Sequence, residues 1–182
     1  FHKKMKVVLT DGNQPIGNGI GPALELMDIM KILERKQDRP ADLEKKSVFL
    51  SGEILEMSGK AKKGNGINLA ISILDSGKAL EKFRQIIKAQ SGNLKNIKYG
   101  KFKKEILVSR SGKIKEINNK KINSLARITG CPTSKTSGIY LYHHVGEKIK
   151  KEEPLLVLYS DSKSKLKEAV QFYKELKPIV VG

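Results

Sequence analysis

The sequence is poor in several residue types, and each shortage excludes a class of protein. Its single cysteine, Cys131, cannot form an internal disulfide bond, which is typical of a reducing compartment and predicts a cytoplasmic protein. Tryptophan is absent and aromatic residues make up 5% of the chain, so the aromatic stacking platform of a single-strand nucleic-acid binder is missing. No apolar run reaches the ~18 residues of a membrane span, and we expect no membrane partner.

Acidic residues are scarce relative to basic ones. The 182 residues include 36 lysines and arginines but 19 aspartates and glutamates, which gives a formal net charge of +17. Such a charge attracts polyanions. The lysines, however, are spread over nearly every segment and match no nucleic-acid-binding motif. We therefore expect a solvated surface that favours phosphate-bearing substrates, and no specific nucleic-acid partner. A polyanion-binding module is the alternative, and a steep salt dependence of binding would support it.

The sequence is organised around residues 6–33. Residues 6–10 (KVVLT) are apolar and β-branched, which predicts a buried strand. A turn follows, and then residues 17–21 (GNGIG) alternate glycine with other residues. This spacing matches neither a dinucleotide fingerprint nor a Walker loop. Pro22 suits the first turn of a helix. One apolar stripe is predicted along that helix, formed by Ala23, Leu26, Met27, Met30 and Leu33.

The rest of the chain divides into two regions of different character. The first is predicted to be helical, with helices over residues 40–58, 67–75 and 77–90 and Ser76 as the N-cap of the last. The second is mainly β. Its strands are predicted over residues 105–109, 113–117, 138–144, 154–160 and 178–181. One helix is predicted over residues 120–129, capped by Asn118 and Asn119 and ended by Gly130, and another follows the capping residues Asp161 and Ser162.

Two segments resemble the thymidine and pyrimidine-nucleoside phosphorylases. The first follows their D-x-N/S-Q-P-x-G … G-x-A-L-E pattern at nine positions, namely Asp11, Asn13, Gln14, Pro15, Gly17, Gly21, Ala23, Leu24 and Glu25. The second, residues 77–92, is similar to their G-K-A-x-E-x-F … x-A-Q-x-G segment. Residues 111–155 are similar to the C-terminal domain of the archaeal-type branch of the family. The resemblance covers nearly the whole chain in collinear order.

This resemblance implies a fold of class α/β plus α+β. Residues 1–93 would form part of the α/β phosphorylase domain, residues 94–100 a linker, and residues 101–182 an α+β C-terminal domain of barrel-sandwich shape. The chain does not begin with methionine, and we expect it to be the C-terminal portion of a longer polypeptide. Biotinyl and lipoyl carrier domains share the barrel-sandwich shape, so a carrier-like module is a further alternative, although their D-K-A or M-K-M motif is absent.

The resemblance also implies an activity for the complete protein. It would be a pentosyltransferase of pyrimidine metabolism and nucleoside salvage that uses phosphate to convert thymidine to thymine and 2-deoxyribose 1-phosphate. AMP phosphorylase is the alternative within the family. The family's K-x-S-x-x-G-G phosphate loop and its R … S-K-K base-binding stretch do not occur in this sequence. We therefore expect no catalytic residue in this chain and no activity of the chain alone. The family's homodimer contacts would lie largely in a missing N-terminal region.

One site is implied within the chain, because family members of this pattern can bind a monovalent cation such as potassium beside the phosphate loop. The matching positions are Ile16 and Gly19, through backbone carbonyls, and Asp28, through its carboxylate. A solvated or capping role for Asp28 is the alternative. His143 and His144 are expected to be structural, because adjacent residues of a strand point to opposite faces and no nucleophile accompanies them. Cys131 is expected to be structural as well.

Overall fold

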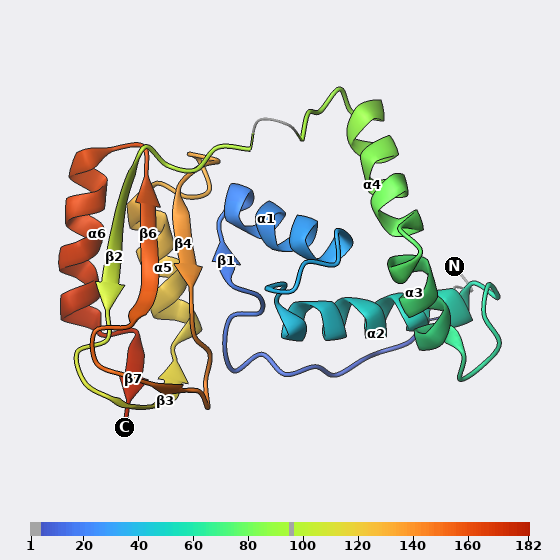
Figure 1. Cartoon of the computed structure of the whole chain (residues 1–182), viewed down its shortest axis with the longest axis horizontal. Coiled ribbons are helices and arrows are strands. Elements are labelled where there is room, and N and C mark those ends of the chain that lie inside the picture. The colour runs from blue at the N-terminus through green and yellow to red at the C-terminus, as the bar shows by residue number, and fades with distance from the viewer. Residues whose placement is uncertain (1–4, 95–96) are drawn as a thin grey trace. The chain divides into compact units, whose positions relative to one another are not determined.

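The computed structural model describes residues 5–94 and 97–182, in two compact units (Figure 1). One unit, called here the helical unit, comprises residues 5–10 and 29–94. The other, the C-terminal unit, comprises residues 11–28 and 97–182. The glycine-rich loop thus packs with the C-terminal unit, whereas the sequence predicts a division near residue 93. The predicted linker, residues 94–100, includes two residues, 95 and 96, that lie outside the described part of the chain.

Four helices follow one another in the first half of the chain, and all four were predicted to within one or two residues at each end. They are α1 (Pro22–Leu33), α2 (Ala41–Met57), α3 (Gly66–Asp75) and α4 (Lys78–Ala89). The predicted N-cap of α4 is wrong. Gly77 occupies the cap position in the left-handed region, with φ 78°. The Ser76 hydroxyl instead donates a hydrogen bond to the Ile73 carbonyl, 3.1 Å away, at the end of α3.

Helices α2 and α3 approach each other closely at a pair of glycines. A Cβ atom on Gly66 would lie 2.1 Å from the carbonyl oxygen of Gly52, and one on Gly52 would lie 2.7 Å from the Ile67 nitrogen. Both distances are far inside van der Waals contact. The absence of side chains at these two positions therefore sets the distance between the helices.

The strand predicted over residues 6–10 is wrong. These residues have no regular secondary structure, and the side chains of Val7 and Leu9 are 85% and 94% exposed. A strand is stabilised by a hydrogen-bonded neighbour. None of the strands in residues 5–94 and 97–182 pairs with this segment. β propensity alone does not form a strand without such a neighbour.

The C-terminal unit is a small mixed α/β domain with two antiparallel sheets. The four-stranded sheet has the order β1-β4-β6-β2, and the three-stranded sheet has the order β5-β3-β7. The strands are β1 (Gly19–Ile20), β2 (Phe102–Leu107), β3 (Gly112–Ile117), β4 (Gly138–Leu141), β5 (Lys148–Ile149), β6 (Pro154–Ser160) and β7 (Ile179–Val181). The predicted antiparallel α+β region is confirmed at this level, while its barrel-sandwich shape stays a prediction. The two-residue strands β1 and β5 were not predicted.

Two capped helices, α5 (Asn119–Thr129) and α6 (Lys163–Leu176), complete this unit. The side chain of Asn118 accepts a hydrogen bond from the Lys121 amide at 3.1 Å, and that of Ser162 accepts one from the Lys165 amide at 3.3 Å. Gly130 ends α5 in the left-handed region, as predicted. These local signals explain why both helices were predictable.

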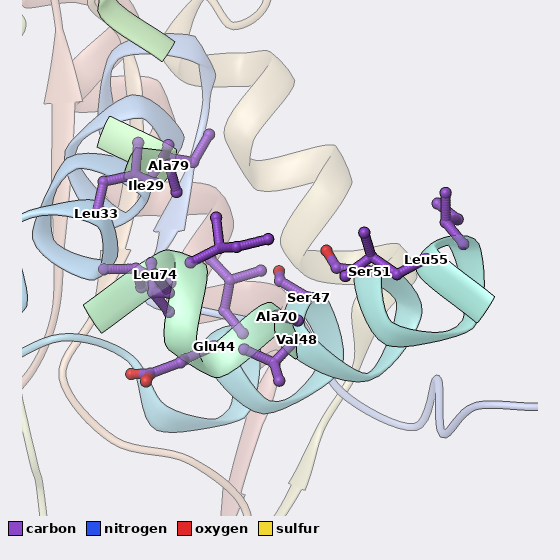
Figure 2. Close-up of a pocket in the computed structure, with 14 residues that line it drawn as sticks. Ile29, Leu33, Glu44, Ser47, Val48, Ser51, Leu55, Ala70, Leu74 and Ala79 are labelled. Atoms are coloured by element: carbon purple, nitrogen blue, oxygen red, sulfur yellow. The ribbon is translucent and has the colours of Figure 1, made fainter. Parts of the chain in front are cut away.

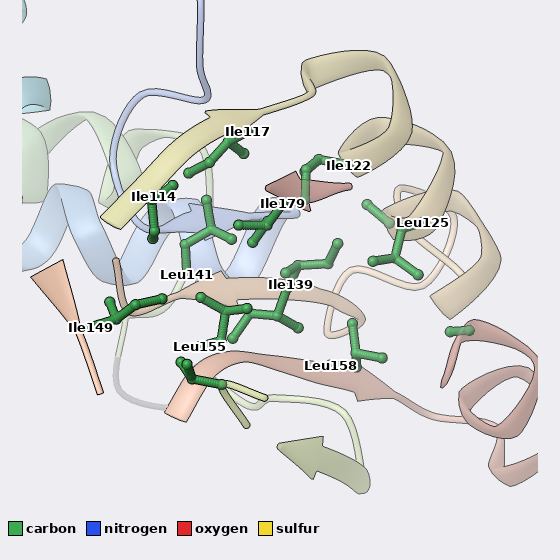
Figure 3. Close-up of a cluster of buried hydrophobic side chains, with 14 of the residues drawn as sticks. Ile114, Ile117, Ile122, Leu125, Ile139, Leu141, Ile149, Leu155, Leu158 and Ile179 are labelled. Atoms are coloured by element: carbon green, nitrogen blue, oxygen red, sulfur yellow. The ribbon is translucent and has the colours of Figure 1, made fainter. Parts of the chain in front are cut away.

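The core of the C-terminal unit lies between the sheets and these two helices, which pack on each other and on β6 (Figure 3). Its most buried members are aliphatic and come from both sheets and both helices. They include Ile114, Ile117, Ile122, Leu125, Ile139, Leu141, Leu156 and Leu158, each no more than 1% exposed. Burying a side chain of this size contributes about 1.5–3 kcal/mol. This core therefore provides a rigid support for the residues attached to β4.

Candidate functional site

The helical unit contains an apolar cavity of about 450 Å³. Figure 2 shows its lining, which comes from α1, α2, α3 and α4. Glu44 is the one charged residue of this lining, and it forms ion pairs with Arg35 and Arg39. The rest of the lining is aliphatic except for the hydroxyl groups of Ser47 and Ser51. This composition suits packing rather than phosphoryl or glycosyl chemistry.

The glycine-rich loop, residues 11–21, has a more specific geometry. Its end forms β1, which adds to the edge of β4 with Gly19 opposite Tyr140 and Ile20 opposite Ile139. The Leu141 amide also donates a hydrogen bond to the Asn18 carbonyl at 2.8 Å. The loop is thus an antiparallel extension of the four-stranded sheet, although more than 100 residues of sequence separate β1 from β4.

Side-chain contacts hold the earlier part of the loop to the same unit. The Val145 amide donates a hydrogen bond to the side-chain oxygen of Gln14 at 2.8 Å. The side-chain amide of Asn119 donates one to the Gly12 carbonyl at 2.7 Å. These contacts involve Asn119 and Val145, which belong to different segments of the C-terminal unit. The loop is therefore fixed at several positions rather than at one point.

A close approach of two backbones locks the loop onto β4. Gly138 has φ +155°, and a Cβ atom there would lie 2.1 Å from the Ile20 carbonyl oxygen. No side chain can be accommodated at this distance. The glycine at this position therefore allows β1 to pair with β4.

Asp28 lies under the loop and is 1% exposed. One oxygen of its carboxylate, Oδ2, accepts hydrogen bonds from the Asn18 and Gly19 amides, both at 2.7 Å. Short bonds from backbone amides to a carboxylate are the strong, charge-assisted kind. Asp28 therefore ties helix α1 to the loop, and the solvated role considered for it is wrong.

The buried face of α1 differs from the predicted stripe. Leu24 and Ile32 are the buried apolar residues of the helix, and together with Asp28 they form a row at intervals of four residues. The predicted residues are only partly buried. The periodicity of apolar residues identified the helix but not its most buried side, because a charged residue occupies the centre of that side.

The predicted cation ligands are brought together only in part. Asp28 and Gly19 are in contact, but this contact is an amide-to-carboxylate hydrogen bond. Within residues 5–94 and 97–182, no group of three or more histidine, cysteine or acidic side chains is placed to hold a metal ion. A cation here would therefore depend on backbone carbonyls together with the single carboxylate. The potassium site at Ile16, Gly19 and Asp28 stays a prediction.

The two histidines have different partners. His143 Nδ1 lies 3.0 Å from the Glu147 carboxylate, and His144 Nε2 lies 2.9 Å from the side-chain oxygen of Asn18. Strand β4 ends at Leu141, so the predicted strand over residues 138–144 is too long. The contact between His144 and the loop was missed by sequence reasoning. The one available signal was a polar residue, Asn18, between two glycines.

Cys131 is partly buried. Burial raises the pKa of its thiol, and the neighbouring Glu25 carboxylate raises it further. A raised pKa keeps the sulfur protonated and weakly nucleophilic at neutral pH. This agrees with the structural role expected from the sequence.

Comparison with known proteins identifies the family. Residues 113–179 match the pyrimidine nucleoside phosphorylase C-terminal domain. A Legionella pneumophila (strain Paris) protein, provisionally named thymidine phosphorylase, is 38% identical over 177 residues, which are 97% of this chain and 34% of that protein. The AMP phosphorylase of Methanococcoides burtonii is 42% identical over 177 residues, which are 95% of this chain and 35% of that protein. The predicted resemblance to the pyrimidine nucleoside phosphorylases is confirmed over nearly the whole chain.

The match concerns the C-terminal part of these relatives, and the chain spans about a third of their length. Members of the family are nucleoside phosphorylases, that is, pentosyltransferases. None of the helices in the described parts of the chain has both the length and the hydropathy needed to cross a bilayer. The glycine-rich loop, residues 11–21, is the candidate functional site of this chain and is called the phosphorylase loop below.

Proposed function

We propose that the complete protein is a thymidine phosphorylase and that this chain is its C-terminal part. In the reaction, a phosphate oxygen bonds to C1′ of thymidine as the bond from C1′ to the base breaks, and the products are thymine and 2-deoxyribose 1-phosphate. The observation that carries the proposal is the collinear match of 97% of the chain to a protein provisionally named for this activity. The buried Asp28 beneath the loop supports it, because a fixed loop is what a positioned substrate requires.

This chain would contribute support and electrostatics rather than reacting groups. The family's phosphate-binding and base-binding motifs are absent from its sequence, and we propose that it is inactive alone. If potassium binds, Ile16 and Gly19 would hold it through carbonyl oxygens and Asp28 through its carboxylate, and the ion would supply positive charge near phosphate. The net charge of +17 favours an anionic substrate in general. The remaining expectations, a cytoplasmic homodimer with contacts upstream, belong to the same proposal.

AMP phosphorylase is the second candidate within the family. It is favoured by the relatives from Methanococcoides burtonii and Methanococcus aeolicus, which carry that name and are 42% and 41% identical to this chain. The two candidates share the bond that is broken and differ in the substrate, since AMP bears a 5′-phosphate and a purine. Both names occur at similar identity, so the identities alone do not decide between them.

The deciding experiment is base release by the complete polypeptide. Thymidine and AMP are supplied in parallel, each with and without inorganic phosphate, and residues 1–182 alone are assayed beside it. Phosphate-dependent release of thymine alone supports the proposal. Release of adenine from AMP would show instead that the substrate is a nucleotide. If a folded complete protein releases neither base, the carrier-like or polyanion-binding alternative is favoured. A mass increase on a lysine would support the former, and salt-sensitive nucleic-acid binding the latter.

The cation is tested with the same assay. The complete enzyme and its Asp28→Ala variant are compared in potassium and sodium salts at equal ionic strength. A potassium site at Asp28 requires that the variant lose the potassium-specific part of the rate. An unchanged potassium response would remove Asp28 from the site.

A further inference from the structure

Asn18 is the residue through which the phosphorylase loop contacts helix α1, strand β4 and the segment that follows β4. Its backbone amide donates a hydrogen bond to Asp28 Oδ2 at 2.7 Å, and its carbonyl accepts one from the Leu141 amide at 2.8 Å. Its side-chain nitrogen donates to the Tyr140 hydroxyl at 3.2 Å, and its side-chain oxygen lies 2.9 Å from His144 Nε2. A residue with four such contacts determines the path of the loop at that point.

The contact with His144 has a defined polarity. The side-chain nitrogen of Asn18 faces the Tyr140 hydroxyl, so the amide oxygen faces the histidine. An amide oxygen can only accept a hydrogen bond. With the amide in this orientation, the contact requires a hydrogen on His144 Nε2, which the ring donates to Asn18.

The other ring nitrogen of His144 strengthens this assignment. Nδ1 is buried and makes no hydrogen bond within residues 5–94 and 97–182. The bond to Asn18 is thus the hydrogen bond that orients the ring in the described structure. A partly buried imidazole with a single directed contact is suited to positioning its partner.

His144 and Tyr140 both belong to β4 or the turn that follows it, and β4 is part of the packed core. Asn18, in contrast, stands between Gly17 and Gly19, where the backbone has more freedom than elsewhere. His144, which follows the packed strand β4, therefore supplies the donor, and Asn18 of the glycine-flanked loop supplies the acceptor. The hydrogen bond connects the loop to the core and restricts the conformations of the loop.

We propose that His144 is a positioning residue of the phosphorylase loop. By donating to the Asn18 side chain, it fixes the peptide groups of Asn18 and Gly19 in the orientation in which both amides bind Asp28. His144 thereby shapes a loop that lies more than 100 residues earlier in the sequence. The consequence for catalysis rests on the proposed function, whereas the positioning itself does not.

The first test uses this chain without any substrate. Amide hydrogen exchange at Asn18 and Gly19 is followed by nuclear magnetic resonance in the parent and three variants. His144→Phe removes the donor, and His144→Gln restores one, because the Gln amide nitrogen reaches about as far as imidazole Nε2. His143→Phe is the matched control, since the neighbouring His143 contacts Glu147 instead of the loop.

We expect exchange at Asn18 and Gly19 to accelerate about tenfold in His144→Phe, the change that corresponds to losing one hydrogen bond. Protection should largely return in His144→Gln and be unchanged in His143→Phe. Amides of the β4–β6 pair serve as an internal reference for global stability. Equal protection of the two loop amides in the parent and His144→Phe would overturn the proposal.

A second measurement needs no variant, so it decides the matter even where His144→Phe does not fold. Long-range proton–nitrogen correlation spectra of the parent distinguish the two tautomers of His144. The proposal requires the hydrogen on Nε2. A neutral ring with its single hydrogen on Nδ1 would contradict it.

The effect of His144 on catalysis is measured in the complete enzyme. If the proposed function holds, His144→Phe lowers kcat/KM for phosphorolysis about tenfold and His144→Gln recovers most of it. A rate in His144→Phe equal to the parent, despite faster loop exchange, would remove the catalytic consequence. If the parent enzyme itself shows no phosphorolysis, the proposed function fails, and the exchange and tautomer results still decide the positioning.

Discussion

Replacing Asp28 with asparagine tests whether the carboxylate holds the loop to helix α1. In the structure, Oδ2 of Asp28 accepts hydrogen bonds at 2.7 Å from the Asn18 and Gly19 amides, and the residue is 1% exposed. Asparagine has almost the same shape and retains an oxygen that can accept both bonds. The substitution therefore changes the charge of the acceptor while creating no cavity.

The magnitude follows from the kind of hydrogen bond that is changed. A bond to a charged group contributes about 1.5–3 kcal/mol and a neutral one about 0.5–1.5 kcal/mol. Two bonds are affected, so Asp28→Asn should lower the free energy of unfolding of the C-terminal unit by about 2–3 kcal/mol. The buried carboxylate also carries a desolvation cost that asparagine avoids, which places the expected value toward the lower end of that range.

The assay is equilibrium unfolding in urea, followed by the signals of individual β4 and β6 amides so that the C-terminal unit is observed by itself. Asp38→Asn is the control, because Asp38 is an exposed aspartate whose ion pair to Lys31 lies in the helical unit. We expect an unchanged midpoint for that variant. A midpoint for Asp28→Asn equal to or above that of the parent would refute the conclusion that this carboxylate holds the loop.

Three further predictions concern titratable groups. Burial tends to raise the pKa of Glu44, but hydrogen bonds from Arg35 and Arg39 outweigh it and leave the pKa below 4.5. Glu44→Gln should therefore destabilise the helical unit by about 1 kcal/mol at neutral pH. In unfolding followed by circular dichroism, the difference in stability between parent and variant should vanish as the pH falls through the lowered pKa of Glu44. The Cys131 thiol, whose pKa burial raises, should react with a disulfide reagent far more slowly in the folded than in the unfolded chain; equal rates would contradict the burial argument. Burial raises the pKa of Tyr173 from 10 to about 12, so stability should decline as the pH rises from 10 to 12, and Tyr173→Phe should reduce that decline in urea unfolding.

Local signals made the helices predictable. Helix α5 has a capping Asn118 at its start and a left-handed Gly130 at its end, and both roles were predicted. Helix α2 has one apolar face, α3 is a short apolar segment, and turn-forming residues separate the two. Each of these signals acts within a few residues of the chain. The sequence therefore contains them whatever the remainder of the protein does.

Strands were less predictable because they depend on partners that lie far away in the sequence. Residues 6–10 have the composition of a strand but no paired neighbour in the described structure. The opposite error occurred at β1, where Gly19 has low strand propensity and yet pairs with Tyr140 of β4. Composition measures how well a residue fits a sheet, and it does not indicate whether a neighbouring strand is available.

The site was predictable in part. Family resemblance placed Gly19 and Asp28 together, and the structure places them in hydrogen-bond contact. The resemblance did not indicate that the contact involves the amide, since it assigned the carbonyl of Gly19 to a cation. Nor did it indicate His144, because 126 residues separate this histidine from Asn18. No local pattern records such a long-range pair.

These observations change how the C-terminal unit is understood in relation to the phosphorylase loop. A separately folded appendage would make few specific contacts with the loop, but here β4 pairs with it and Gly138 leaves room for it. His144 also contacts Asn18, and the Val145 amide donates a hydrogen bond to Gln14. Removing residues 97–182 would leave the loop without these partners. It would also leave Asn18 and Gly19 with only Asp28 to order them, across a segment rich in glycine. The loop and the C-terminal unit are therefore one packing unit, and a substitution in the core beneath β4 should disturb the loop as readily as a substitution within it.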